Sequence, residues 1–237
     1  MLYLISLGIF DEKDMSIRAI ECAKKCDFLF FERYTAKPKT DAKKLSEFLG
    51  KEVKEIKRED IEENSEDIIK LSEKNNVGII VSGDALVATT HISLIVEARK
   101  RGIETKVIHS SSIYTAVCSS GLQIYKFGRT VTLTKRGEKS IIKEIKENKK
   151  RGLHSLILLD IDMELEDAIN ILLKNKAIKE NEKIVLYSNI GEDEIIKYIS
   201  PKEFFESDFR NFKEYQYSII IPGKLHFMEE EYLSLLK

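Results

Sequence analysis

Residues able to bind or position a polar ligand gather in one stretch of the chain, from Val77 to Gly128. An apolar run there ends in Ser82-Gly83-Asp84, and a second run ends at His109, directly before Ser110-Ser111-Ser112. Open α/β sheets bind ligands at the carboxyl ends of their strands, and N–H groups at a helix entry can bind a polar ligand. The stretch predicts a small-molecule site, although the Asp84 carboxylate is equally suited to capping a turn or a helix.

Motifs of other site types are missing. The histidines lack HxH and HExxH spacing, so we expect structural side chains and no metal site at His91, His109, His154 and His226. No Walker A loop occurs, no Ser, His and Asp set can be nominated, and the loop from Leu7 to Asp11 has one glycine instead of GxGxxG. Thr89 and Thr90 are expected to cap the next helix. The residues alone indicate a small-molecule-binding α/β protein.

Alternating strands and helices must position this site. Apolar runs predict strands at residues 3–8, 27–34, 77–81, 105–108, 130–133, 153–161, 183–190 and 217–221. Apolar side chains at helical spacing predict helices between most of them. Cys22 and Cys26 share a helix face with Met15 and Ala19, so we expect both cysteines in the core. The pattern predicts the α/β class.

Length, charge and composition limit the organisation. A chain of 237 residues suits two domains, and the composition change at Lys135 to Ser140 divides them into residues 1–135 and 136–237. The net charge of −1 offers no basic field for nucleic acid or acidic lipid. The apolar start lacks the basic region and cleavage site of a signal peptide, and no run approaches the about 20 residues of a membrane span. We expect a cytoplasmic protein without nucleic-acid or membrane partners.

Ordered motifs across nearly the whole chain resemble the diphthine synthase family. They include GDALVATTH (residues 83–91), VIHSSSIYTAV (107–117), GLQIYKFG (121–128), GLHSLILLDI (152–161) and PGKLH (222–226). The order of these motifs is more specific than any one of them. The resemblance implies a methyltransferase of the tetrapyrrole-methylase-like class, with two α/β domains and the ligand cleft between them.

The resemblance also implies a cofactor, a substrate and site residues. The cofactor is S-adenosylmethionine, and the protein substrate is translation elongation factor 2. Its 3-carboxy-3-aminopropyl-modified histidine is N-methylated to diphthine, a step of diphthamide biosynthesis, typically by a homodimer. Matching motif by motif implies eight cofactor contacts: Ile9, Asp84, Val87, Ser112, Ile113, Leu159, Ile190 and Ser218. It identifies no general base and no catalytic side chain.

The chain departs from the family at several places. Ala85 stands where the family usually has proline, which removes a rigid φ but no functional group. The segments around residues 135–142 and after Asp162 are shorter than usual, which bears on the protein-substrate side more than on the cofactor. Two alternatives stay open: a methyltransferase of the same class acting on a corrinoid or ribosomal RNA, and a non-catalytic adaptor that binds the elongation factor.

Overall fold

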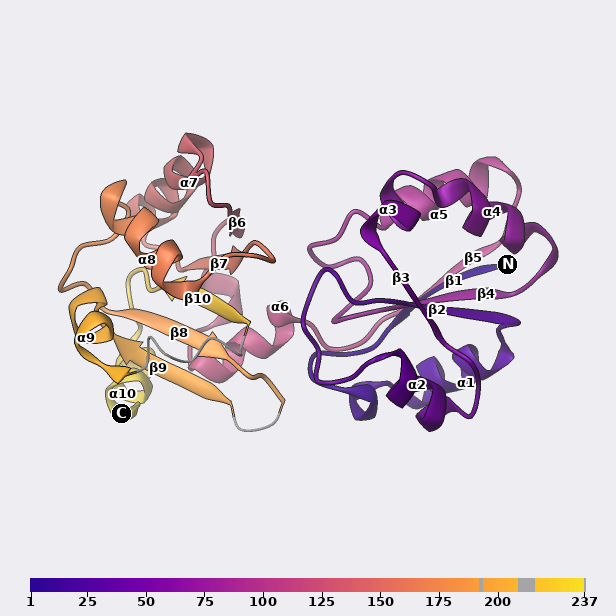
Figure 1. The fold of residues 1–237 in the computed structure, drawn as a ribbon. Coiled ribbons are helices and arrows are strands. Elements are labelled where there is room, and N and C mark those ends of the chain that lie inside the picture. The colour runs from indigo at the N-terminus through magenta and orange to yellow at the C-terminus, as the bar shows by residue number, and fades with distance from the viewer. Residues whose placement is uncertain (192–193, 209–215, 237) are drawn as a thin grey trace. The chain divides into compact units, whose positions relative to one another are not determined.

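The chain folds into two compact units, Met1–Tyr114 (unit 1) and Thr115–Lys237 (unit 2). The computed structural model describes residues 1–191, 194–208 and 216–236. Each unit has one five-stranded sheet with helices packed against it (Figure 1). The predicted α/β class is confirmed.

Unit 1 is built on a parallel sheet with the strand order β3-β2-β4-β1-β5. Its strands are β1 (Leu2–Ser6), β2 (Phe28–Glu32), β3 (Lys54–Ile56), β4 (Val77–Val81) and β5 (Thr105–Ile108). Its helices are η1 (Glu12–Asp14), α1 (Ile17–Lys25), α2 (Ala42–Leu49), α3 (Arg58–Glu62), α4 (Ser65–Lys74) and α5 (Ile92–Lys100). A short helix, α6 (Ile113–Ala116), lies where the two units divide.

Both faces of the unit 1 sheet are covered, which explains why its central strands read as continuous apolar runs. Leu4 and Ile79 face a core shared with α3, α4 and α5, whereas Ile5 and Ile80 face a core shared with α1 and α2. Figure 1 shows these two helix groups on opposite sides of the sheet. Cys22 and Cys26 are buried in the second core, as predicted.

Unit 2 has a mixed sheet with the order β6-β7-β10-β8-β9, in which β6 and β7 are parallel and the other pairs are antiparallel. Its strands are β6 (Val131–Leu133), β7 (Ser155–Leu159), β8 (Ile184–Ser188), β9 (Ile195–Ile199) and β10 (Tyr217–Ile221). Its helices are η2 (Val117–Ser120), η3 (Ile124–Lys126), α7 (Lys139–Lys150), α8 (Leu165–Lys174), α9 (Pro201–Glu206) and α10 (Phe227–Leu235).

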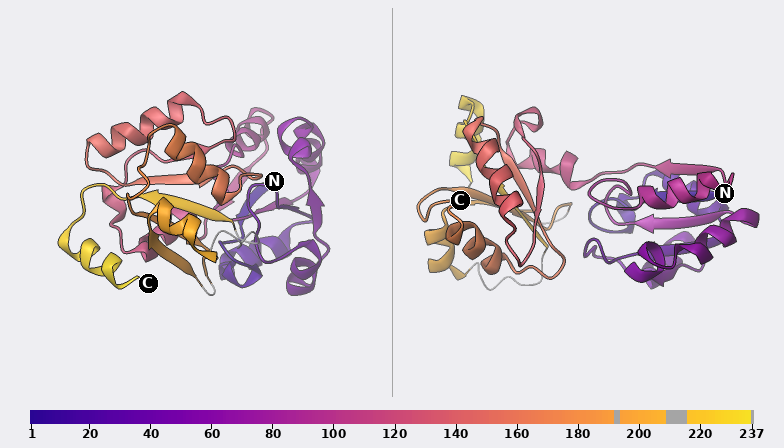
Figure 2. Two further views of the ribbon diagram at one scale, coloured as in Figure 1. Left: turned by 60° about the vertical axis from the view of Figure 1, so that its left-hand side comes forward. Right: turned by 90° about the horizontal axis from the view of Figure 1, so that it is seen from above.

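Successive side chains of the unit 2 strands point to opposite faces of the sheet. Ile219 and Ile157 pack with α7, α8 and α9 in one large apolar cluster. Helices α7 and α8 lie side by side on this face (Figure 2). Tyr187 is fully buried, and its hydroxyl donates to Ala116 O at 2.7 Å. Residues before η2 are therefore held by the second sheet.

The division between the units falls before Thr115, and the boundary predicted at Lys135 is corrected accordingly. The strand predicted at residues 130–133 is β6, which pairs with β7 of the second sheet. Strand pairing thus places residues 131–133 in unit 2, in agreement with the division before Thr115. No helix among the described residues is long and apolar enough to span a membrane.

Candidate functional site

Three neighbouring parallel strands of unit 1 end at one edge of the sheet. β1 pairs with β4 on one side and with β5 on the other. The segments that follow these strands carry five of the predicted contact residues: Ile9, Asp84, Val87, Ser112 and Ile113. The parallel topology therefore brings together residues that are far apart in the sequence.

The loops after β1 and β4 are joined by backbone hydrogen bonds. Gly8 N donates to Gly83 O at 3.1 Å, and Gly83 N donates to Gly8 O at 2.7 Å. Both glycines have positive φ values, +98° and +72°, which a residue with a side chain adopts only with strain. Ser6 Oγ also accepts from Ala85 N at 2.9 Å. The site is thus a preformed edge rather than a set of independent loops.

Asp84 is a buried acceptor at the centre of this edge. Its side chain is 7% exposed, and its Oδ1 accepts from Leu86 N at 3.1 Å. Its Oδ2 accepts from Ser110 N at 3.2 Å and lies 2.8 Å from His109 Nδ1. Asp84 thereby connects the ends of β4 and β5, and three of its about four acceptor positions are used.

Hydrogen bonds from the backbone hold two of the other four unit 1 positions in place. Ile9 N donates to Asp14 Oδ2 at 3.1 Å, and Val87 N donates to Asp84 O at 3.0 Å. Ser112 is buried, and Ile113 begins α6. Because α6 has only four residues, it provides no extended helix N-terminus for a ligand.

A buried polar cluster, which sequence reasoning did not select, lies at the end of β2. Glu32 and His91 are fully buried, with His91 Nε2 3.8 Å from Glu32 Oε2 and 3.3 Å from the Tyr34 hydroxyl. Burial raises the pKa of the Glu32 carboxyl, although hydrogen bonds from Thr35 oppose this shift. His91 Nδ1 lies 3.2 Å from Ala85 O, so the cluster supports the Asp84 loop. In the sequence, the signal for this cluster was Glu32, a charged residue at the end of the apolar run that forms β2.

The predicted caps at Thr89 and Thr90 are wrong. Thr89 Oγ1 donates to Ala85 O at 2.7 Å, and Thr90 Oγ1 donates to Glu62 Oε1 at 3.1 Å. His91 is the N-cap of α5 and makes no side-chain capping bond. The two hydroxyls instead bind groups of the preceding loop and of α3.

Unit 2 carries the other three predicted contacts at one end of its own sheet. Leu159 is the last residue of β7, and Ile190 follows the end of β8. Ser218, near the start of β10, pairs with Leu158 and Tyr187. Because β10 runs antiparallel to both strands, its start lies beside their ends. The cofactor contacts at all eight positions stay predictions.

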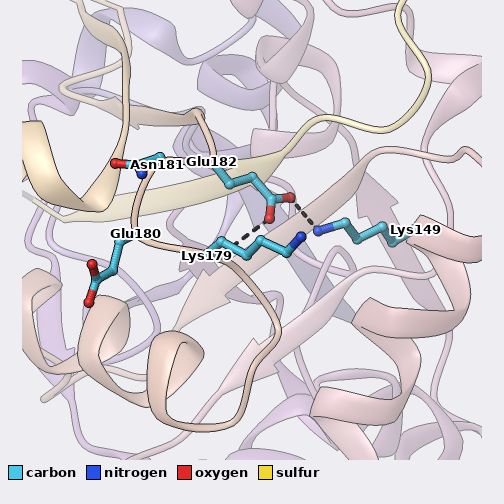
Figure 3. A pocket seen from close by; sticks show the side chains of 5 residues that line it. All are labelled: Lys149, Lys179, Glu180, Asn181 and Glu182. Carbon is cyan, nitrogen blue, oxygen red and sulfur yellow. Dashed lines mark hydrogen bonds and ion pairs between the residues drawn. The ribbon is translucent and has the colours of Figure 1, made fainter.

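No group of three or more potential metal ligands occurs in the described part of the chain. A surface hollow in unit 2 is lined by Lys149 and residues 179–182 (Figure 3). Glu182 forms an ion pair with Lys149 and accepts from Lys179 N at 3.2 Å. Residues 179–182 precede β8, whereas Ile190 follows it, so the hollow lies at the other end of that strand from the predicted contact.

The chain is similar to known methyltransferases over nearly its whole length. The family model of tetrapyrrole (corrin/porphyrin) methylases matches residues 1–198. The chain is 38% identical to the diphthine synthase of Methanocaldococcus jannaschii, with 100% of this chain and 98% of that protein covered. The chain belongs to the diphthine synthase family. It is 33% identical to the family member of Archaeoglobus fulgidus, covering 98% and 94% of the two chains.

A solved structure of a diphthine synthase matches with a TM-score of 0.92 and 33% identity, covering 98% of this chain and 94% of that one. The family resemblance is thus confirmed, and the chain is a methyltransferase. Membership of the diphthine synthase family also accounts for the missing GxGxxG motif, since the matched motifs lie on other loops. The departure at Ala85 is accommodated: Ala85 is buried, and its N–H, which proline would lack, donates to Ser6 Oγ.

Proposed function

We propose that this chain uses S-adenosylmethionine to methylate the amino group of the 3-carboxy-3-aminopropyl-modified histidine of translation elongation factor 2. Relatives named diphthine synthase, 33–38% identical over nearly the whole chain, support this activity. The observation that carries it is the gathering of Ile9, Asp84, Val87, Ser112 and Ile113 at one edge of the unit 1 sheet.

The groups at this edge suit the proposed methyl donor. A Cβ built on Gly83 meets no atom within 4 Å, so there is open space beside the turn. The buried Ser82 Oγ has no hydrogen-bond partner among the described residues, and such a group is costly unless something pairs with it. With one acceptor position left on Asp84, these groups fit the hydroxyl and ammonium groups of S-adenosylmethionine.

When bound, S-adenosylmethionine supplies an already activated sulfonium methyl. The residues of the chain then have to hold the donor and the amine in line. Such alignment lowers a barrier by roughly 7–11 kcal/mol. The hydrogen bonds between Gly8 and Gly83 and from Ser110 N to Asp84 fix the loops that would do this.

The remaining parts of the proposal rest on the family. Leu159, Ile190 and Ser218 are proposed donor contacts from unit 2. A homodimer is proposed, and Phe227 and Leu235 of α10, which are 67% and 72% exposed, supply apolar surface that a second copy would cover. Light scattering tests the dimer. A cytoplasmic location is proposed because the substrate is a translation factor, and cell fractionation tests it.

The activity is tested by mixing the purified chain with methyl-labelled S-adenosylmethionine and elongation factor 2 that carries the modified histidine. We expect label in the modified factor and none in the unmodified factor. No label would exclude the proposed function, and complex formation without label would identify an adaptor. Label in ribosomal RNA or a corrinoid instead would identify a different methyltransferase of this class.

A further inference from the structure

One histidine at the unit 1 edge combines an exposed ring with a buried carboxylate partner. The His109 side chain is 68% exposed, whereas that of Asp84 is 7% exposed. The two are joined by the 2.8 Å contact between Nδ1 and Oδ2. A buried carboxylate that orients one ring nitrogen leaves the other nitrogen to face a reactant.

The hydrogen bonds of Asp84 determine which ring nitrogen carries the hydrogen. Asp84 already accepts from Leu86 N and Ser110 N, as an ionised carboxylate does. His109 Nδ1 must therefore donate to Oδ2. In the neutral ring Nε2 then holds a lone pair, and no described residue forms a hydrogen bond with it.

The other three histidines differ in this respect. His91 and His154 are fully buried, with both ring nitrogens near polar partners. His226 is exposed, but its Nδ1 accepts from Met228 N at 3.3 Å, so a neutral ring carries hydrogen on Nε2. Among the residues that the structure describes, His109 is thus the one histidine that offers solvent an oriented proton acceptor.

The substrate ammonium must lose a proton before it attacks, because it has no lone pair, and an oriented acceptor beside it can take that proton. His109 lies directly after β5, beside Asp84 and between that strand and Ser112. Imidazole exchanges protons near neutral pH. We propose that His109 Nε2 is the general base that deprotonates the substrate ammonium, with Asp84 as its positioning residue. The proposal rests on the proposed function.

The substrate ammonium gives one proton to Nε2, and the amine nitrogen then forms a bond to the methyl carbon. The bond between that carbon and sulfur breaks, and its electron pair stays on sulfur. Asp84 stabilises the imidazolium through Nδ1, and Nε2 returns the proton to solvent before the next transfer. Each methyl addition to an ammonium form releases one proton in this way.

Two substitutions separate a base from a positioning residue. His109→Asn keeps an N–H that can reach Asp84 but cannot accept the proton, whereas His109→Ala removes both functions. We expect both to lower the methyl-transfer rate about 10²-fold to 10⁴-fold and to bind S-adenosylmethionine with unchanged affinity by calorimetry. His109→Asn, which can keep the hydrogen bond to Asp84, should also unfold like the wild type. Added imidazole should restore part of the His109→Ala rate.

The rate and the donor affinity of these two variants can each contradict a role of His109 as the general base. A wild-type rate in His109→Asn would leave only a positioning role, and loss of donor affinity in both variants would make His109 a donor contact. A wild-type chain that transfers no methyl group would exclude the proposed function and this one with it. Nitrogen-15 NMR of the wild type is an independent readout: a hydrogen on Nε2 of the neutral ring would contradict the assignment.

Discussion

His154 Nε2 lies 3.1 Å from Glu229 Oε1, and these side chains are 0% and 1% exposed. Gly223 N donates to His154 Nδ1 at 2.8 Å, so the ring is neutral and its Nε2–H donates to Glu229. Glu229 also accepts from Gln123 N at 2.9 Å and forms an ion pair with Lys126. One carboxylate thus joins α10 to η3 and to the residue before β7.

Removing this carboxylate should destabilise unit 2. We expect Glu229→Ala to lower the free energy of unfolding by about 3–5 kcal/mol, because buried partners lose their acceptor. Glu229→Gln keeps the shape and part of the hydrogen bonding, so a loss of about 1–3 kcal/mol is expected. Urea titration measures both. Glu231→Ala on the exposed side of α10 is the control and should change the value by no more than about 0.5 kcal/mol; an equal loss there would contradict the role of Glu229.

The same cluster predicts how stability depends on pH. Burial raises the pKa of Glu229, but hydrogen bonds led by that from Lys126 outweigh it and bring the pKa to about 2. Burial lowers the pKa of His154 below its usual 6.5. In both cases the unfolded chain binds more protons, so stability falls as the pH drops below 6.5 for His154 and from 4.5 toward 2 for Glu229.

Urea titrations between pH 7 and pH 3 test this linkage. The wild type should lose stability throughout the range. Glu229→Gln removes the carboxyl titration, so its curve should be flatter below pH 4.5. Parallel curves for the two proteins below that pH would show that Glu229 contributes nothing there.

Close packing of Gly121 against Tyr232 also joins α10 to the segment before η3. Gly121 has φ +79°, and a Cβ built on it would lie 2.1 Å from Tyr232 Cδ1. Gly121→Ala should lose about 1–2 kcal/mol through backbone strain and about 1–3 kcal/mol more through the clash. Gly102→Ala, with φ +72° and no atom within 4 Å, should lose only the first part. If the clash matters, Tyr232→Ala should relieve part of the Gly121→Ala loss in a double-mutant cycle.

Periodicity predicted the central strands well, because they are buried on both faces or alternate clearly. β4, β5 and β10 match their predicted ranges. The edge strand β3 was missed because its three residues, Lys54-Glu55-Ile56, include only one apolar side chain. β9 was also missed, although its five residues include three isoleucines.

The sequence indicates that Asp84 lies at a strand end but does not show which residues it contacts. Strand ends alone indicated Asp84, whereas its partner His109 lies on a different strand end, brought near by the parallel pairing of β1 with β4 and β5. The four histidines look alike in the sequence, and burial and tautomer separate them only once the fold is known. Such contacts depend on tertiary structure, which local patterns do not contain.

Asp84→Ala tests the centre of the site. The motif alone predicts weaker donor binding with little loss of stability. Because the structure shows the Asp84 carboxylate accepting from Leu86 N and Ser110 N, we expect a stability loss of about 1–3 kcal/mol as well. Calorimetric titration with S-adenosylmethionine should show at least about tenfold weaker binding, equivalent to about 1.4 kcal/mol.

Asp27→Ala is the matched control for this substitution. Asp27 Oδ2 accepts from Asn76 N at 2.8 Å, at the amino end of β2 and β4. Asp27→Ala removes a carboxylate that also bridges backbone between strands, but at the other edge of the sheet, so it should lower stability without changing donor affinity. If both variants bind S-adenosylmethionine like the wild type, the donor does not depend on Asp84. If both bind it equally weakly, the loss reflects unit 1 stability rather than a contact at the β4 end.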